Sequence, residues 1–216
     1  MNIHTVYESF QRYFRPKRVR KMRENLAILD DPQARILDVG GVAGWWKEVR
    51  PASADITIVN LDSALREASE EAGYQFFVGD ARSLPFANGD FDLVHSNSVI
   101  EHVGNLDDQW RFAREVHRCG KAIYIQTPNK WFPVEPHLIA LFIHWLPFKI
   151  QRHLVRRFSV WGWLTKPSQL EIDKFLHGTR LLTGREVDAM FPGCVRCDEK
   201  FMGFTKSFVV VQVKGD

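Results

Sequence analysis

The chain has few cysteines and lacks a long apolar run. Its 216 residues include three Cys, which is too few for a disulfide scaffold and favours a reducing compartment. The longest apolar run, residues 138–143, is far shorter than the roughly 20 residues that a membrane-spanning helix needs. The first residues also lack the apolar core of a secretory signal peptide. These absences predict one cytoplasmic domain over residues 1–216, soluble or peripheral at a membrane.

Charge is distributed unevenly along the chain, although the net charge is only +3. Residues 1–25 contain seven Lys or Arg and two acidic residues, and residues 130–160 contain five and one. The rest of the chain has 17 basic and 23 acidic side chains. An acidic body with two basic segments indicates an anionic partner at those segments, although solvated helix faces give similar counts.

Short buried strands alternate with helices over the first 130 residues. The expected strands are 35–39, 56–61, 74–78, 91–96 and 121–126, separated by helices that include 44–49, 64–72 and 106–119. A helix at 184–190 precedes two last strands, 195–201 and 207–213, which are close enough in sequence to pair as antiparallel neighbours. The pattern predicts an α/β fold of Rossmann-like type, with a seven-stranded, mostly parallel sheet and an antiparallel last strand.

Residues 131–182 fall outside this alternation. They contain four prolines and are too long for a plain loop, so we expect a helical insert, or lid, after the fifth strand. Within the insert, the apolar run 138–146 precedes a basic amphipathic segment, 148–158, and we expect two adjacent helices. Such a pair can rest on a membrane surface or bury its apolar face on the rest of the protein.

Acidic and small residues follow the first four expected strands. They are Asp38 with Gly40, Gly41 and Gly44 after the first, Asp62 with Ser63 after the second, Asp80 with Ala81 after the third, and Ser96 with Asn97 at the fourth. The carboxyl ends of parallel strands meet at one edge, where open α/β sheets bind ligands. A lone Asp after a strand is usually a helix cap or a turn residue, but four markers in order favour a ligand that offers hydrogen-bond donors.

Three further motifs lie in the same region, namely Gly79-Asp80-Ala81, Leu84-Pro85-Phe86 and Asp90-Phe91-Asp92-Leu93-Val94. Together with the glycine turn they resemble the class I S-adenosylmethionine-dependent methyltransferases of the small-molecule type, over residues 30–130. The resemblance implies S-adenosylmethionine as the cofactor. Asp38 and the glycine backbone would face its methionine part, Asp62 its ribose, and Asp80 with Ala81 its adenine. Ser96 and Asn97 would line the sulfonium end.

One position departs from the family turn, which usually reads Gly-x-Gly-x-Gly. Position 42 is valine, and the additional glycine is Gly41. We expect this change to shift the turn without abolishing binding. The resemblance also implies that the basic segment 1–30 forms a helical cap over the cofactor pocket.

Methyl transfer from a sulfonium depends largely on in-line positioning. A hydroxyl acceptor also needs a base or a metal to remove its proton. His137, His102 and Glu135 are the candidates, although a capping or packing role for His137 fits the sequence equally well. Glu101-His102 resembles part of the Glu-x-x-Glu-His metal site of some relatives, but Ser98 replaces the first glutamate, so we expect no metal.

The acceptor is only broadly indicated. The stretch from Pro128 to His137 resembles methyltransferases associated with bacterial surface polysaccharides and lipid-linked glycans. This resemblance implies a small-molecule or glycan acceptor, which could be lipid-linked, methylated at oxygen. The fourth strand lacks the motif that holds a flipped base, so no nucleic acid is expected. Peripheral membrane contact through residues 137–160, a non-catalytic binding protein and a nicotinamide-dependent dehydrogenase remain alternatives.

Overall fold

The computed structural model describes residues 3–53 and 55–212. Its centre is a sheet with the strand order β3-β2-β1-β4-β5-β10-β8, in which β9 also pairs with β10. The parallel strands are β1 (Ile36–Val39), β2 (Ile56–Asn60), β3 (Gln75–Val78), β4 (Phe91–Asn97) and β5 (Gly120–Pro128). β10 (Phe204–Gln212) runs antiparallel to β5. The predicted fold class is therefore confirmed, with predicted strand boundaries close to the observed ones.

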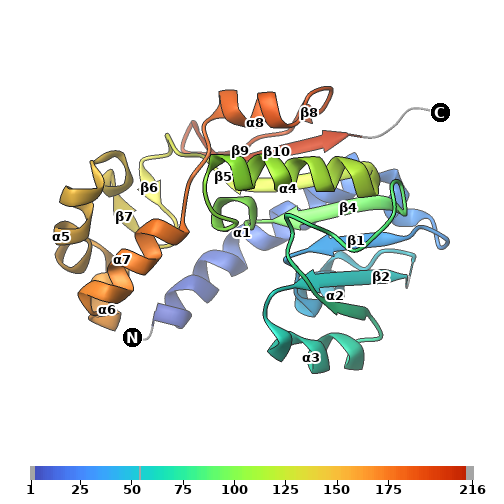
Figure 1. Ribbon diagram of the computed structural model, residues 1–216, viewed down its shortest axis with the longest axis horizontal. Coiled ribbons are helices and arrows are strands. Elements are labelled where there is room, and N and C mark those ends of the chain that lie inside the picture. Colours follow the sequence, from blue (N-terminus) through green and yellow to red (C-terminus); the bar gives the residue numbers. More distant parts are fainter. Residues whose placement is uncertain (1–2, 54, 213–216) are drawn as a thin grey trace.

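The predicted strand 195–201 is divided into two short strands. β8 (Val195–Arg196) and β9 (Glu199–Phe201) both pair antiparallel with β10. The register of β10 against β9 shifts between Thr205 and Ser207, so Lys206 is an extra residue in that ladder. A β-bulge of this kind bends a strand and redirects a side chain, and it lies at the end of β10 nearest the insert (Figure 1).

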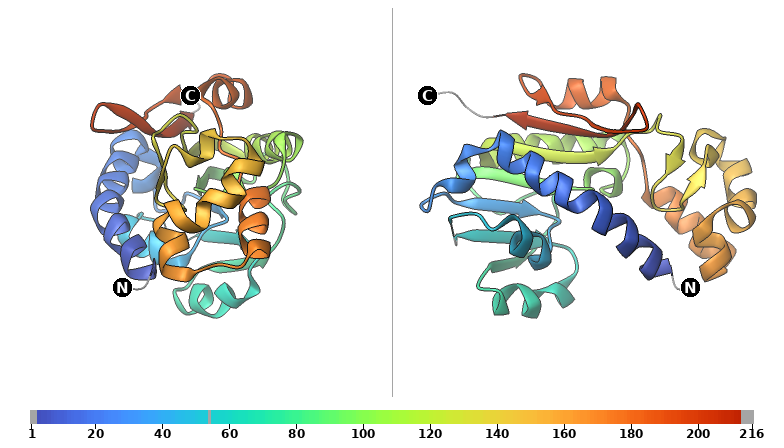
Figure 2. Two further views of the ribbon diagram at one scale, coloured as in Figure 1. Left: turned by 90° about the vertical axis from the view of Figure 1, so that its left-hand side faces the viewer. Right: turned by 180° about the vertical axis from the view of Figure 1, so that it is seen from behind.

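Helices cover both faces of the sheet (Figures 1 and 2). On one face, α4 (Leu106–Cys119) and α8 (Gly184–Met190) contribute to a hydrophobic cluster with Phe91 and Val94 of β4. On the other face, α1 (Ile3–Asn25) and α2 (Ala43–Val49) contribute to a second cluster around Trp46. α3 (Arg66–Glu71) follows the short 3₁₀ helix η2 (Ser63–Leu65) and packs at the β3 edge. The result is the three-layer architecture expected for a mostly parallel sheet.

The N-terminal helix connects the sheet with the insert. α1 extends from Ile3 to Asn25 and is followed by the 3₁₀ helix η1 (Ala27–Asp30). Its first turns lie beside the insert, and its last turns lie against the sheet (Figure 2). The basic segment predicted as a helical cap over residues 1–30 is thus helical where it is described, while residues 1 and 2 lie outside the described residues.

The sequence led us to expect a helical insert, but the observed insert is only partly helical. It begins with a hairpin of β6 (Val134–Glu135) and β7 (Ala140–Leu141), followed by η4 (Ile143–Trp145), α5 (Phe148–Phe158), α6 (Val160–Thr165) and α7 (Gln169–Gly178). The predicted apolar helix over 138–146 is wrong, because Ile139 and Phe142 have positive φ angles of 51° and 58°, which interrupt a right-handed helix. Leu138, Ala140 and Ile143 of this segment instead fill a separate small core with Val155 and Ile172.

The insert lies beyond the carboxyl ends of the parallel strands (Figure 1). Two backbone hydrogen bonds attach it to the rest of the chain: Lys130 donates to the carbonyl of Leu182 at 2.9 Å, and Arg180 donates to that of Glu101 at 2.8 Å. Over residues 3–53 and 55–212, each helix is too short or too polar to cross a membrane.

Candidate active site

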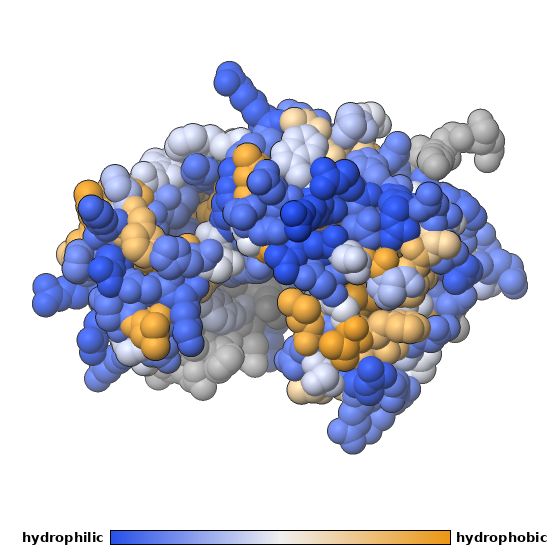
Figure 3. All heavy atoms as spheres, in the orientation of Figure 1, coloured by the Kyte–Doolittle hydropathy of each residue, from blue (hydrophilic) through white to orange (hydrophobic). Residues whose placement is uncertain are grey.

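Two cavities meet at the carboxyl edge of the sheet. The strand-end cavity, of about 340 Å³, is lined by residues that include Gly40, Asn60, Asp80, Ala81, Ser98 and His102. The insert cavity, of about 450 Å³, is lined by residues of α1, the insert and β10, among them Phe14, Arg18, His137, Trp161, Phe175 and Lys206. Ser98 lines both cavities. The space-filling view shows the molecule hollowed between the insert and the sheet (Figure 3).

The glycine turn after β1 needs two of its three glycines. Gly40 has a φ of 73°, and a Cβ atom there would lie 2.5 Å from the side chain of Val99. A Cβ atom on Gly41 would lie only 1.7 Å from the Asp38 carboxylate. Gly44 lies inside α2, and the nearest atom to its Cβ position is 3.7 Å away. The turn therefore depends on Gly40 and Gly41 but not on Gly44 for space.

The valine that departs from the family turn fits its backbone. Val42 is extended, with φ −138° and ψ 143°, and precedes the first residue of α2. Such angles are ordinary for a β-branched residue. The additional glycine at position 41 is explained by the carboxylate beneath it, so the two changes in the turn have separate causes.

Asp38 lies beneath the turn rather than in the cavity. Its side chain is buried, Trp46 Nε1 donates to its Oδ2 at 2.8 Å, and His95 Nδ1 lies 2.6 Å from its Oδ1. His95 in turn stacks against Trp45, with ring centroids 5.5 Å apart. This direction differs from the one predicted, because both carboxylate oxygens serve the packing of α2 on β4.

Asp80 lines the strand-end cavity, and Asp62 follows Leu61, which also lines it. Asp62 is exposed, and it accepts a hydrogen bond from the Ala64 backbone at 3.0 Å, next to the equally exposed Ser63. Asp80 accepts hydrogen bonds from Arg82, with the shortest at 2.6 Å. The hydrogen bonds from the Arg82 side chain are the main cause of the lowered pKa of Asp80, so this carboxylate is ionised and still partly exposed.

The end of β4 connects the two cavities. The Ser96 hydroxyl donates to the Val39 carbonyl at 2.8 Å and is buried, while Asn97 Oδ1 accepts a hydrogen bond from Arg18 at 3.3 Å. Ser98 has a φ of 57°, and its hydroxyl donates to Gln126 at 2.8 Å. A non-glycine residue in the left-handed region is uncommon and often marks a functional position.

A pair of histidines bridges the two cavities. The Nε2 atoms of His102 and His137 are 3.2 Å apart, and His137 Nδ1 lies 2.7 Å from Glu135 Oε1. Burial lowers the pKa of His102, and the charge of His137 lowers it further. Burial alone would lower the pKa of His137 too, but its hydrogen bond to Glu135 and the nearby carboxylates raise it. The two rings therefore differ in basicity, and His137 is the more basic of the pair.

A buried carboxylate lies behind this pair. Glu101 Oε2 accepts a hydrogen bond from Thr127 at 3.0 Å, and its Oε1 has no hydrogen-bond partner among the described residues. Burial raises the pKa of Glu101. One ligand atom each of Glu101, His102 and His137 lie within 4.8 Å of one another. In the sequence only Glu101 and His102 are neighbours, since His137 lies 35 residues after His102.

Comparisons with known proteins point to methyltransferases. A profile described as a methyltransferase domain matches residues 37–122. The malonyl-[acyl-carrier protein] O-methyltransferase of Pseudescherichia vulneris is 28% identical over 160 residues, which are 70% of this chain and 64% of the relative's length. This match spans just under two thirds of the relative. The profile covers less than half of the chain, so the two comparisons together support the predicted resemblance to the class I S-adenosylmethionine-dependent methyltransferases.

Solved structures, one of them a methyltransferase, share the fold at low identity. An S-adenosylmethionine-dependent methyltransferase from Mesorhizobium loti has a TM-score of 0.58 at 14% identity, covering 88% of this chain and 94% of its own. The N-terminal domain of EvdMO1, solved with SAH bound, has a TM-score of 0.55 at 17% identity. The match covers 91% of this chain and 79% of that structure's chain. At these identities the likeness concerns the fold.

The strand-end cavity of this methyltransferase suits the cofactor of its family. Its volume is within the usual range for small-molecule sites, and it lies at the carboxyl ends of the strands. Its walls combine apolar side chains, including Ala81 and Val99, with the Asp80 carboxylate, and the glycine backbone borders it at Gly40. Of the residues predicted to bind the cofactor, Gly40, Asp80 and Ala81 line this cavity directly.

Three residues that line the insert cavity were not predicted from the sequence. Arg18 and Lys206 come from opposite ends of the chain, and Phe175 comes from the insert. No local motif connects them. The basic composition of residues 1–25 was the only signal, and it did not indicate which cation faces inward.

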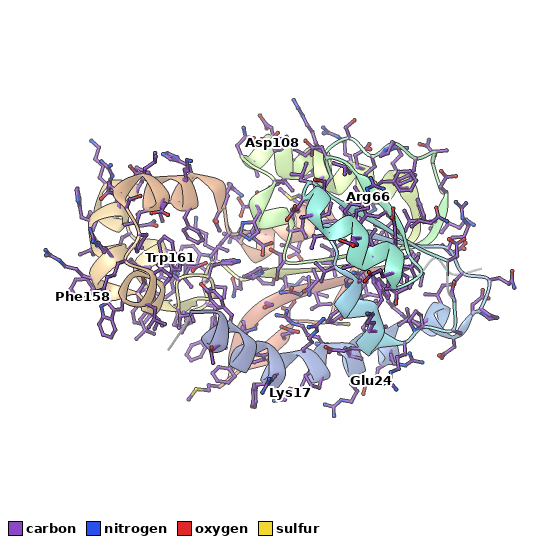
Figure 4. All side chains as sticks on the ribbon, turned by 90° about the horizontal axis from the view of Figure 1, so that it is seen from below. Lys17, Glu24, Arg66, Asp108, Phe158 and Trp161 are labelled. Carbon is purple, nitrogen blue, oxygen red and sulfur yellow. The ribbon has the colours of Figure 1, made fainter. Side chains whose placement is uncertain are left out.

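The outer surface of the insert has a different character. Phe158 and Trp163 are 65% and 67% exposed, and Phe158 points away from the sheet (Figure 4). Arg156 and Arg157 lie beside them in the sequence and are also exposed. Peripheral membrane contact through residues 137–160 stays a prediction.

Proposed function

We propose that this methyltransferase binds S-adenosylmethionine in the strand-end cavity and methylates a hydroxyl oxygen of a small molecule or glycan held in the insert cavity. The observation that carries the proposal is the junction of the two cavities at Ser98, beside the His102–His137 pair. The curated relative is named as an O-methyltransferase, which supports oxygen as the atom methylated.

The residues at the strand ends would hold the cofactor. Gly40 would bring its backbone close to the ligand, Asp80 and Ala81 would border the adenine, and Asp62 would accept from the ribose hydroxyls. Bound S-adenosylmethionine supplies a methyl group already activated by its sulfonium. The protein then has to align the acceptor and keep water out.

His137 would remove the acceptor proton. It can do so only in its neutral form, and because its pKa is raised, the neutral form increases as the pH rises above the ordinary histidine value of about 6.5. His102, whose pKa is lowered, presents a neutral ring 3.2 Å away that can share the proton. Glu135 would hold the resulting imidazolium through the 2.7 Å contact with Nδ1.

A divalent cation is a second way to remove the same proton. Glu101, His102 and His137 together offer three ligand atoms, and Glu101 Oε1 is buried without a partner among the described residues. A cation there would displace the proton shared by the histidines and polarise the acceptor hydroxyl. Dialysis against a chelator, followed by metal analysis and re-addition of Mg²⁺ or Zn²⁺, distinguishes the histidine base from the cation. Loss and recovery of activity would favour the cation.

Calorimetry with S-adenosylmethionine, S-adenosylhomocysteine and NAD tests the cofactor assignment. We expect the first two to bind and NAD not to bind. Transfer of an isotope-labelled methyl group to hydroxylated acceptors then tests catalysis. Cofactor binding without transfer to any acceptor would favour the non-catalytic alternative, and binding of NAD alone would refute the proposal.

A further inference from the structure

The insert cavity has an unusual combination of aromatic walls and buried cations. Phe14, Phe132, Trp161 and Phe175 border it, with Trp161 and Phe175 in contact at 5.6 Å between ring centroids. Arg18 and Lys206 are the Lys or Arg side chains in its lining. Among the lining residues that the structure describes, none is Asp or Glu. A cavity of about 450 Å³ with such walls suits a flat organic molecule.

Lys206 is placed in this cavity by the bulge in β10. It is the extra residue between the pairs Thr205–Lys200 and Ser207–Glu199. Its ammonium nitrogen lies 4.0 Å from the centre of the Phe14 ring, and its side chain is only 15% exposed. Burial, with a further contribution from the charge of Arg18, lowers the pKa of Lys206 to about 8. The fold therefore keeps a cation largely away from water, which costs free energy unless a partner compensates it.

Among the described residues, the acid within salt-bridge distance of Lys206 is Glu199, which already pairs with Arg18. Arg18 holds both oxygens of Glu199, at 2.7 and 3.0 Å, through its planar guanidinium. Lys206 Nζ approaches one of these oxygens only to 3.8 Å. Arg18 and Lys206 thus share one carboxylate at the cavity wall, and Arg18 holds it more closely. An anionic group in the cavity would give Lys206 a closer partner.

We propose that the acceptor carries an oxyanion, a carboxylate or a phosphate, on a flat apolar body, and that Lys206 binds this anion. The inference rests on the proposed function, in which the insert cavity holds the acceptor. The aromatic walls would hold the body, and the hydroxyl to be methylated would then face His137. Recognition by Lys206 also explains why the chain places a bulge at this point of β10.

Matched ligands and variants test the assignment without turnover. Binding of 4-hydroxybenzoate, 4-hydroxyphenyl phosphate and the neutral 4-hydroxybenzyl alcohol is measured by calorimetry on the full chain. We expect at least one anion to bind about tenfold or more tightly than the alcohol, as a charge-assisted contact provides. Lys206→Met should remove this preference, and Lys206→Arg should retain it. Lys200→Met, on the exposed face of the same hairpin, should match the unchanged protein.

The outcomes distinguish this inference from the proposed function. An equal preference in Lys206→Met, or anions that bind no better than the alcohol, would overturn the anion site. The stronger of the two anions identifies carboxylate or phosphate. S-adenosylhomocysteine affinity, measured on the same samples, should be unchanged in every variant. A protein that binds the cofactor but shows no anion preference refutes only the present inference, whereas anion binding without cofactor binding refutes the proposed function.

Discussion

The strand-end cavity and the insert cavity are built in opposite ways. The strand-end cavity is formed by the ends of four strands and the turns that follow, all within residues 40–103. The insert cavity combines α1, the hairpin and helices of the insert, and the last strand. The first is a product of local chain order, and the second depends on long-range packing. The contrast explains why the cofactor was indicated by sequence motifs and the acceptor was not.

The two cavities also differ in how their charges are satisfied. The acids at the strand ends have local partners, as Asp80 has Arg82 two residues away. In the insert cavity, Arg18 reaches Glu199 across 181 residues. A change in one cavity should therefore leave ligand binding in the other intact, and the following variants test this independence.

Replacement of His137 by glutamine should have the largest effect. Loss of a general base reduces rates by about 10²–10⁴-fold, and we expect kcat to fall within this range. S-adenosylhomocysteine affinity should not change, because His137 lies in the insert cavity. Single-turnover rates with the identified acceptor, together with calorimetry, measure both. Undiminished transfer would indicate that the acceptor is already ionised when it binds.

Replacement of Asp62 by alanine should affect only the strand-end cavity. Loss of charge-assisted hydrogen bonds to the ribose should weaken cofactor binding by about 100-fold. Because Asp62 also accepts from the Ala64 backbone, Asp62→Asn is the matched variant that keeps an oxygen for this cap. A normal affinity in both variants would end the ribose assignment, and a loss only in alanine would assign the effect to the cap.

The difference between local chain order and long-range packing also determines which features the sequence predicts. Asp80 and Ala81 line the strand-end cavity, where the sequence put them, because a strand end fixes the position of the residues after it. Their contact with the cofactor stays a prediction. Asp38 was assigned to the right turn but not to the right direction, because its orientation depends on Trp46 and His95, which pack from α2 and β4. The insert hairpin was missed because positive φ angles at Ile139 and Phe142 have no signature in an apolar run. The inward position of Lys206 was not predicted, because it depends on the shift of register between β9 and β10.

Alanine at position 41 should destabilise the protein without touching the insert cavity. The new methyl group would overlap an Asp38 carboxylate that Trp46 and His95 hold in place, and such overpacking costs about 1–3 kcal/mol. Thermal unfolding should show a fall of about 2–4 °C per kcal/mol for a chain of this size. Gly44→Ala is the control. It has space and should be neutral or stabilising, since alanine is the better helix former. Equal effects at both positions would contradict the assigned difference.

The smallest expected effect separates the charge of Glu135 from the base itself. The pKa of His137 is raised by the carboxylate that contacts its Nδ1, so activity should fall as the pH decreases through that raised value. In Glu135→Gln the charge is removed, burial then lowers the pKa, and the acidic limb of the kcat profile should move to lower pH. Relative activity at about pH 6 should increase severalfold, within about a factor of ten. Cofactor affinity, measured at the same pH values, should remain constant because the strand-end cavity is built independently of this carboxylate. An unchanged acidic limb would mean that the observed titration belongs to another group or to the acceptor.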